Sequence, residues 1–254
     1  MTDLVVLLGH HIGYSASPAV HDAAFAALGM DARYELADVA PDRLADAVAA
    51  LRAPGRLGAN VTQPHKLAVC DLVDEVAPEV RRLGAANTLM RRGDRLVAHN
   101  TDLPAVAEEL GRLGTVRRAV VLGNGGASRA VQAALAEAGA EVAVVDRARW
   151  TELPSRLATA DLLVNATPVG TDSDETPVGP DLLRPDLAVL DLVYRPTPTR
   201  LVREAREHGA TARGGAGMLL TQAVLSFELW TGHQAPVAVM AEALRVELGA
   251  DRDG

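Results

Sequence analysis

The sequence lacks several features that mark particular classes of protein. Cys70 is its single cysteine, so no disulfide can form within the chain. No positively charged start followed by an apolar stretch marks export, and we expect a cytoplasmic protein. The apolar runs, such as 4–8 and 119–122, fall far short of the roughly 20 residues that span a bilayer. We therefore expect no membrane segment.

An excess of basic charge is also missing. The formal net charge is −8, and the arginines are dispersed rather than gathered on one segment. Binding to a nucleic acid backbone is therefore not expected. The chain has 254 residues, of which 48% are hydrophobic. It can therefore bury a sizeable core and is long enough for one large domain or two modest ones.

Short Val/Leu-rich runs alternate with Ala-rich segments of helical period, which is typical of an α/β protein with a largely parallel sheet. We predict strands at 4–8, 118–122, 141–146, 161–166 and 187–193. We predict helices at about 18–28, 41–51, 64–74, 103–113, 127–138, 198–208, 216–231 and 236–248.

The segment RRAVVLGNGGASRAVQAALAEAGAEVAVVD contains a glycine-rich turn between a predicted strand and a predicted helix. Gly123 permits a tight turn, Gly125 lets the backbone approach a pyrophosphate, and the helix start presents free N–H groups to it. A second strand ends on Asp146, about 20 residues further on. This context favours a dinucleotide site over an ordinary strand-to-helix turn.

Ser15 and Ser17 precede a predicted helix in YSASPAVHDAAFAALG. Pro18 favours extended geometry at Ser17, and alternate side chains of an extended segment point the same way, so the two hydroxyls share one side. The helix that follows adds positive potential at the same place. The segment suits a small carboxylate. The alternative is that Ser17 only caps the helix.

The 25 basic side chains are 24 arginines and one lysine, Lys66. Pro64 starts a predicted helix, which places Lys66 in its first turn, where the helix dipole favours the neutral amine. A lysine can lose its proton at accessible pH, whereas arginine effectively cannot. We therefore interpret Lys66 as a proton-transfer residue, with a solvated surface lysine as the alternative.

Polar residues in three further segments are candidates for the same site. Asp102 is the expected acidic partner of Lys66, or else the N-cap of the helix that follows. Asn87 and Asn100 are equally able to stabilise turns. Gln222 lies in a predicted helix that is apolar nearly all round, so its amide needs a partner from the backbone or from a ligand.

Eight motifs, taken in order, resemble those of the shikimate dehydrogenase family. They are SxSPxxH (15–21), NVTxPxK (60–66), GAxNT (84–88), NTD (100–102), GxGGASRA (123–130), NAT (165–167), DxVYxPxxT (191–199) and GMLxxQ (217–222). The resemblance covers nearly the whole chain, and eight motifs in this order are far more specific than a glycine loop alone.

The resemblance implies an enzyme that reversibly reduces 3-dehydroshikimate to shikimate with NADP, or with NAD as the alternative. It implies an N-terminal α/β substrate domain of residues 1–100 with about 219–254. A Rossmann-like, doubly wound NAD(P)-binding domain of about 101–218 is inserted between these two parts. It leaves a monomer or a homodimer open.

The resemblance also implies roles for individual residues. Lys66 and Asp102 would be the catalytic pair. Ser15 and Ser17 would hold the substrate carboxylate with help from Tyr194. The substrate-binding set is Ser15, Ser17, Asn60, Thr62, Asn87, Tyr194 and Gln222. The cofactor-binding set is Gly123, Asn124, Gly125, Gly126, Ala127, Asp146, Arg147, Asn165, Thr167, Gly215 and Met218.

The chain departs from the family pattern after the second strand of the cofactor unit. Arg147 could grip the 2′-phosphate of NADP, while Asp146 would repel it and favour NAD. Only 14 residues separate Asp146 from Asp161, where the family commonly has a full helix and another strand. We therefore expect an abbreviated adenosine side of the pocket.

Two other functions remain open at this stage. A quinate or aminoshikimate dehydrogenase would use the same acid–base pair on a related ring acid. A catalytically silent small-molecule binding protein could share the same fold.

No metal site is expected. The seven histidines include His10, His11 and His21, but none shows ligand spacing together with acidic or thiol partners. We expect them to be surface or helix residues.

Overall fold

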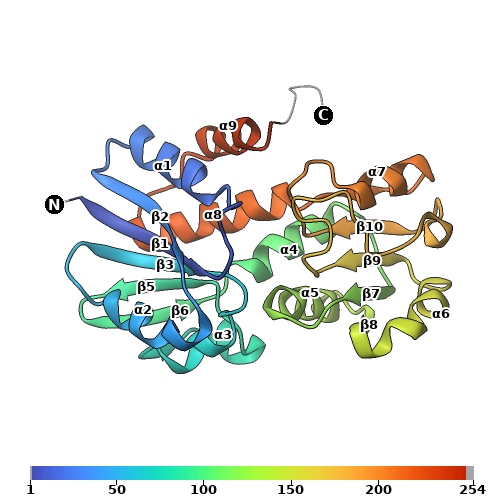
Figure 1. Cartoon of the computed structure of the whole chain (residues 1–254), viewed down its shortest axis with the longest axis horizontal. Helices are drawn as coiled ribbons and strands as arrows, with labels where there is room; N and C mark the ends of the chain where they lie inside the picture. The colour runs from blue at the N-terminus through green and yellow to red at the C-terminus, as the bar shows by residue number, and fades with distance from the viewer. Residues whose placement is uncertain (1, 250–254) are drawn as a thin grey trace. The chain divides into compact units, whose positions relative to one another are not determined.

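Two separate β-sheets organise residues 2–249, the part of the chain that a computed structural model describes. Residues 2–101 and 220–249 form the first unit around one sheet, and residues 102–219 form the second unit around the other (Figure 1). The α/β class expected from the sequence is confirmed in both units. No helix within residues 2–249 is long and apolar enough to cross a membrane.

The sheet of the first unit has six strands in the order β2-β1-β3-β5-β6-β4. β1 pairs in parallel with both β2 and β3, while β5 runs antiparallel to β3 and to β6. The ends of β1, β3 and β6 and the start of β5 therefore lie at the same edge of the sheet. The strands are β1 (Asp3–Gly9), β2 (Ala32–Asp38), β3 (Arg56–Val61), β4 (Glu75–Val76), β5 (Thr88–Arg92) and β6 (Arg95–His99).

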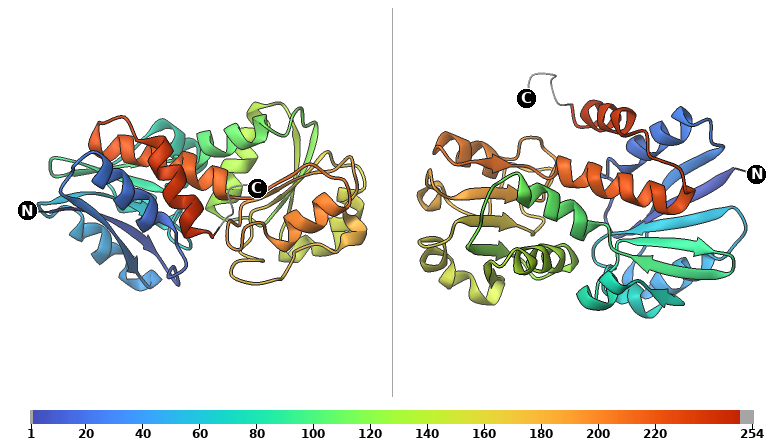
Figure 2. Two further views of the ribbon diagram at one scale, coloured as in Figure 1. Left: turned by 90° about the horizontal axis from the view of Figure 1, so that it is seen from above. Right: turned by 180° about the vertical axis from the view of Figure 1, so that it is seen from behind.

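Helices cover both faces of this sheet. On one face, α1 (Ser17–Ala27) packs beside α9 (Val237–Glu247), as Figures 1 and 2 show. The first unit also contains most of α8 (Ala216–Thr231). The other face buries Leu4, Val6 and Leu8 of β1 against α2 (Leu44–Ala50) and α3 (Pro78–Leu83). β1 is buried on both faces, as its continuous apolar run predicts.

The second unit is built on five parallel strands in the order β11-β10-β9-β7-β8. The chain moves outward from β7 to β8 on one side and from β9 to β10 and β11 on the other. The sheet therefore has a topological switch point between β7 and β9. The strands are β7 (Arg118–Leu122), β8 (Glu141–Val145), β9 (Leu162–Asn165), β10 (Ala188–Asp191) and β11 (Ala212–Arg213).

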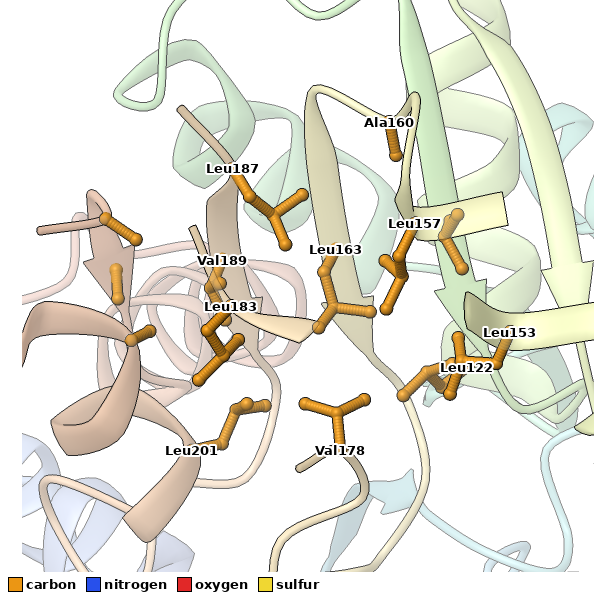
Figure 3. Close-up of a cluster of buried hydrophobic side chains, with 14 of the residues drawn as sticks. Leu122, Leu153, Leu157, Ala160, Leu163, Val178, Leu183, Leu187, Val189 and Leu201 are labelled. Atoms are coloured by element: carbon orange, nitrogen blue, oxygen red, sulfur yellow. The ribbon is translucent and has the colours of Figure 1, made fainter. Parts of the chain in front are cut away.

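Four helices lie within this unit. α4 (Asp102–Gly111) and α5 (Gly126–Glu137) pack against each other, and α5 contacts β7 and β8. Leu153 and Leu157 of α6 (Leu153–Leu157) and Leu201 of α7 (Arg200–Glu207) share one core cluster with Leu122 and Leu163 of the strands (Figure 3). α6 and α7 therefore cover one face of the sheet.

Short 3-10 helices complete the described part of the chain. They are η1 (Pro41–Arg43), η2 (Ala68–Asp71), η3 (Arg147–Glu152) and η4 (Pro180–Leu182). η3 and α6 occupy the short segment after β8, and no further strand extends the sheet beyond β8 among the described residues. The abbreviated segment expected from the sequence is present.

Most predicted elements are confirmed within a few residues, but the predicted helix at 64–74 is wrong. Residues 63–67 form turns and only η2 follows. The main-chain carbonyl of Lys66 accepts from the N–H of Ala86 at 2.8 Å, so a distant segment takes the group that Cys70 N–H would use in an α-helix. Lys66 is therefore not in a helical first turn, and the helix-dipole argument for its neutral amine no longer applies.

Candidate active site

The motifs of the first unit gather at one edge of its sheet. Ser15 and Ser17 follow β1, Thr62 and Lys66 follow β3, and Asn87 precedes β5. Asn60 on β3 pairs with Thr88 on β5, and Thr88 pairs with His99 at the end of β6, so these segments are neighbours across the sheet. Segments more than 70 residues apart in the sequence meet here because the parallel strands β1 and β3 end, and the antiparallel strand β5 begins, at the same edge.

Ser15 and Ser17 place their hydroxyls together. Ser15 Oγ donates to Ser17 Oγ at 3.2 Å, and the N–H of Ser17 donates to Ser15 Oγ at 3.3 Å. The two hydroxyls lie together as expected, but the extended geometry predicted at Ser17 is wrong, because Ala16 has φ −81° and ψ −4° and Ser17 is already helical. The alternative that Ser17 is the N-cap is wrong, because α1 begins at Ser17 and Ala16 caps it without a side-chain hydrogen bond.

Asn60 directs its side chain into the protein. Its Oδ1 accepts from the Tyr34 hydroxyl at 2.8 Å, and its Nδ2 lies 3.1 to 3.2 Å from Asn87 O, Thr88 Oγ1 and Ser226 Oγ. The residue is 5% exposed. The amide oxygen thus joins β3 to Tyr34 of β2, and the amide nitrogen joins β3 to β5 and α8.

Thr62 and Lys66 flank a tight connection after β3. The Gln63–Pro64 peptide bond is cis, and His65 N–H donates to Thr62 O at 2.9 Å. His65 is 2% exposed, with its Nε2 2.7 Å from Val39 O. A buried imidazole therefore anchors the turn that carries Lys66. The hydroxyl of Thr62 has no hydrogen-bond partner within residues 2–249, which leaves it available to a ligand.

Asn87 and Asn100 fasten the NTD motif to the GAANT motif. Asn87 Oδ1 accepts from Thr101 N–H at 2.8 Å, and Asn87 Nδ2 donates to Thr101 Oγ1 at 2.9 Å. Asn100 Nδ2 donates to Ala85 O at 2.9 Å. These bonds fix the chain just before Asp102, which begins α4 and is 4% exposed.

Gln222 lies on α8 one turn before Ser226. It is 9% exposed, which confirms the buried amide expected from the apolar helix. Ser226 Oγ donates to Gln222 O at 2.8 Å and lies 2.8 Å from Thr88 Oγ1. Ser226 therefore locks this turn of α8 against β5. The sequence analysis missed Ser226, although a lone serine in an apolar helix, four residues after Gln222, is a visible signal.

In the second unit the glycine loop lies at the switch point of the sheet. Gly123 has φ +94°, and a Cβ there would lie 3.1 Å from Ala166 O, so the loops after β7 and β9 are adjacent. Gly125 precedes α5, has open space where a Cβ would be, and gives α5 no side-chain cap. Ser128 Oγ donates to Gly123 O at 2.7 Å. This arrangement leaves a helix N-terminus open to a phosphate group.

Asp146 and Arg147 follow β8, directly beside this loop, since Gly123 N–H donates to Val145 O at 2.9 Å. Asp146 Oδ1 accepts from the N–H groups of Ala148 and Arg149, so its carboxylate caps η3. Arg147 is exposed and its guanidinium forms no ion pair with a described residue. The arginine is thus free to bind an anion, while one oxygen of the aspartate is already engaged.

Asn165 and Thr167 shape the loop after β9. Asn165 is fully buried; its Oδ1 accepts from Thr167 Oγ1 at 2.6 Å, and its Nδ2 donates to Asp191 Oδ1 at 2.9 Å. Asp191 also accepts from Val193 N–H at 3.1 Å and from Thr199 Oγ1 at 2.6 Å. Burial raises the pKa of Asp191 above its ordinary value.

Asp191 is therefore the hub that joins the end of β9 to the start of α7, a role that the sequence analysis did not assign. The signal that could have found it is a carboxylate at the end of a wholly apolar strand.

Gly215 and Met218 lie at the start of α8, and Tyr194 lies half-buried in the loop after β10. A Cβ on Gly215 would overlap the carbonyl oxygen of Leu192, so only glycine fits there. Met218 is 7% exposed. The main chain after β10 and the start of α8 are thus in close contact within the second unit.

The histidine expectations need correction. His65 is neither at the surface nor in a helix, and His21, although helical, is fully buried. The expectation that no histidine group has an acidic partner is also wrong, since His10 Nδ1 lies 2.8 Å from Asp38 Oδ1. The sequence could not show this pairing because the partners are 28 residues apart.

Comparison with known proteins accounts for this arrangement. A family model for the shikimate dehydrogenase substrate binding domain matches residues 7–89, and one for the shikimate 5′-dehydrogenase C-terminal domain matches residues 215–245. A shikimate dehydrogenase (NADP(+)) of Halorubrum lacusprofundi is 46% identical over 276 residues, covering 97% of this chain and 99% of that protein. The chain belongs to the shikimate dehydrogenase family.

Solved structures of the family have the same fold. A shikimate 5-dehydrogenase from Thermus thermophilus, in complex with NADP(H) and shikimate, is 38% identical with a TM-score of 0.86, covering 97% of this chain and all (100%) of that one. A ligand-free 5-ketofructose reductase of a Gluconobacter species is 31% identical with a TM-score of 0.80, covering 97% and 99%. The family fold is thus shared by enzymes named for different substrates.

Proposed function

We propose that the protein is a shikimate dehydrogenase that reversibly reduces 3-dehydroshikimate to shikimate with NADPH. The observation that carries this proposal is the edge of the first sheet, where the paired hydroxyls of Ser15 and Ser17 share one strand edge with Thr62 and Lys66. Hydroxyls suit a carboxylate and a polyol ring, and a single lysine in a chain of arginines suits proton transfer.

The first unit is the proposed substrate domain. Ser15 and Ser17, with Tyr194, would hold the carboxylate of the ring acid, and Thr62, Asn87 and Gln222 would contact its hydroxyls. Asn60 supports this set by holding β3, β5 and α8 together, since its own amide is bonded within the protein. The support for these roles is the family resemblance and, for Ser15, Ser17, Thr62 and Asn87, their placement at one edge of the first sheet.

The second unit is the proposed NAD(P)-binding domain. The open start of α5, with Gly123, Asn124, Gly125, Gly126 and Ala127, fits a pyrophosphate. Asn165 and Thr167 lie in the adjacent loop after β9, where they would line the cofactor site. Gly215 immediately precedes α8 and Met218 lies in its first turn, and both would also line that site. Asp146 and Arg147 would face the adenosine end, where Arg147 suits the 2′-phosphate of NADP. Asp146 opposes this less than its charge suggests, because one of its oxygens caps η3.

The reaction transfers one proton and one hydride. When bound, NADP⁺ supplies the hydride acceptor and NADPH the hydride donor. In the oxidation of shikimate, Lys66 takes the proton of the reacting hydroxyl, and in the reduction it returns a proton to the carbonyl oxygen. Asp102 is its proposed acidic partner. General acid–base help of this kind is worth about 10²–10⁴ in rate.

The test is the initial rate at which the purified protein forms NADPH from NADP and shikimate. Parallel assays replace NADP with NAD, or shikimate with quinate. Turnover of shikimate with NADP at higher kcat/KM than any other pair is the expected result. Faster turnover of quinate would reassign the substrate to a related ring acid. No turnover with any pair, together with measurable shikimate binding, would identify a catalytically silent binding protein.

We also propose that the protein works in the cytoplasm as a monomer or a homodimer. The support is its single cysteine and its membership of a biosynthetic enzyme family. Light scattering coupled to size-exclusion chromatography separates the two assembly states, since the monomer has a mass of 26.6 kDa.

A further inference from the structure

The ends of β1 and β2 bring together two imidazoles and a carboxylate. β1 and β2 are paired in parallel with Gly9 opposite Asp38, so the two residues that follow Gly9 lie beside Asp38. One ligand atom from each of His10, His11 and Asp38 can be chosen so that all three lie within 4.8 Å of one another. These residues play no part in the proposed reaction.

The backbone holds this group in place. His10 N–H donates to Gln63 O at 3.1 Å, and Val39 N–H donates to Gly9 O at 2.7 Å. His11 has φ +57°, in the left-handed region that non-glycine residues seldom adopt. This conformation lets its N–H donate to Asp38 Oδ1 at 3.1 Å, with the two imidazole centroids 3.8 Å apart.

We propose that His10, His11 and Asp38 form a binding site for a divalent transition-metal ion of the zinc type. Imidazole nitrogen and carboxylate oxygen are ordinary zinc ligands, and ligand atoms of one tetrahedral zinc lie roughly 3.3 Å apart. The spacing in this group already approaches that value, so modest side-chain rotations complete the site. Three protein ligands leave one position for water.

The electrostatics of the group favour a cation. Asp38 contributes a carboxylate that is hydrogen-bonded to His10 and to the N–H of His11. Imidazole is the commonest metal ligand in proteins, through the lone pair of one ring nitrogen. His10, at 34% side-chain exposure, and Asp38, at 54%, are accessible to an ion from solvent.

An ion held here would cross-link two segments of the first unit. It ties the end of β2 to the segment that leads from β1 to Ser15 and Ser17. In the same segment, His10 N–H donates a hydrogen bond to the main-chain carbonyl of Gln63. Gln63 lies three residues before Lys66. The proposal does not depend on the proposed dehydrogenase activity, because its readout is metal binding.

Calorimetric titration of the tag-free, metal-stripped protein with Zn²⁺ tests the site. We expect one ion per chain, and at least a tenfold weaker association for Asp38→Asn and for His11→Asn. Asparagine at position 11 tolerates the left-handed backbone and removes only the imidazole. Matched controls are Asp42→Asn and His233→Asn, both exposed and outside the group, which should bind as the parent does.

Three outcomes would overturn the proposal. In the first, the parent binds Zn²⁺ no more tightly than His11→Asn does. In the second, the control variants lose as much Zn²⁺ affinity as the ligand variants. In the third, a Cys70→Ser variant loses Zn²⁺ binding. Circular dichroism of each variant shows whether it is folded. The visible spectrum with Co²⁺ gives a second readout, because a thiolate-to-metal band would place the ion at Cys70 instead.

Discussion

The main-chain carbonyl of Lys66 accepts a hydrogen bond from the N–H of Ala86 at 2.8 Å. The backbone at Lys66 is thus held by a tertiary contact and by the buried His65 next to it, and neither uses the lysine side chain. Substitutions of that side chain should therefore leave the turn intact, which makes Lys66 suitable for a functional test.

We expect Lys66→Ala to lower kcat by about 10²–10⁴ while shikimate still binds, because it removes the proton carrier. Lys66→Arg should be almost as impaired, since arginine keeps the charge but cannot give up its proton. The measurements are kcat from NADPH formation and the shikimate Kd from calorimetry. Arg81→Ala, which removes one exposed charge on α3, is the control and should keep full activity. Retained turnover in Lys66→Arg would show that charge alone suffices.

Replacement of Arg147 should change cofactor preference. Arg147→Ala is expected to raise the KM for NADP about tenfold and to leave the KM for NAD unchanged, because a charge-assisted bond to the 2′-phosphate is lost. Arg149→Ala is the matched control in η3, where the guanidinium lies 3.8 Å from Glu152. Equal changes for both cofactors would mean that Arg147 acts on the loop rather than on the phosphate.

Acid should destabilise the protein through His21. This imidazole is fully buried, its ring nitrogens have no hydrogen-bond partner within residues 2–249, and burial lowers its pKa to about 3 from 6.5. Below pH 6.5 the unfolded chain binds a proton there that the folded protein does not bind. Stability is therefore lost as the pH falls from 6.5 toward 3, by about 2 kcal/mol between pH 6.5 and 5.

Urea unfolding from pH 8 to pH 5 measures this loss in the parent protein and in His21→Phe, which keeps a ring stacked on Tyr34. The variant should lose about 2 kcal/mol less over this range than the parent, whatever its stability at neutral pH. Parallel pH curves for the two proteins would rule out His21 as the cause.

Loss of Asp191 should weaken cofactor binding selectively. Asp191→Ala removes the acceptor of Val193 N–H and of Thr199 Oγ1 and one of the two acceptors of Asn165 Nδ2, so we expect a loss of about 2–4 kcal/mol in stability and a higher KM for NADP. Asp191→Asn should cost less, because it avoids a buried charge and can still bond to both side chains. Shikimate affinity, measured by calorimetry without cofactor, should stay at the parent value in both. If Asp191→Ala and Asp191→Asn lose similar amounts of stability, the effect comes from the charge of Asp191 rather than from its hydrogen bonds.

Elements with strong local patterns were predictable from the sequence. β7 and α5 follow from an apolar run, a glycine turn and an Ala-rich helix, and each lies within one residue of its prediction. The strands β2, β3, β4, β5, β6 and β11 were not predicted. β2, for example, is an edge strand in which Tyr34 is the single buried residue, so it shows no apolar run. Its position comes from pairing with β1, which sequence periodicity does not report.

The candidate site was predictable in its residue types and not in its connections. A lone lysine and an amide in an apolar helix are visible in the sequence itself. The bonds of Asn60 to Ser226, 166 residues away, and of Asn165 to Asp191 arise only when strand ends converge. The helix predicted at 64–74 failed for the same reason, since the decisive hydrogen bond comes from Ala86.

The two ends of the described chain belong to one unit, and this has a consequence for synthesis on the ribosome. Trp230 Nε1 donates to Leu89 O, and Ser226 bonds to Asn60 and Thr88, so the first unit needs residues that are made only after the whole second unit. Residues 102–219 are contiguous and are complete earlier. The middle of the chain can therefore fold first, while the N-terminal strands wait on the ribosome for α8 and α9 to emerge.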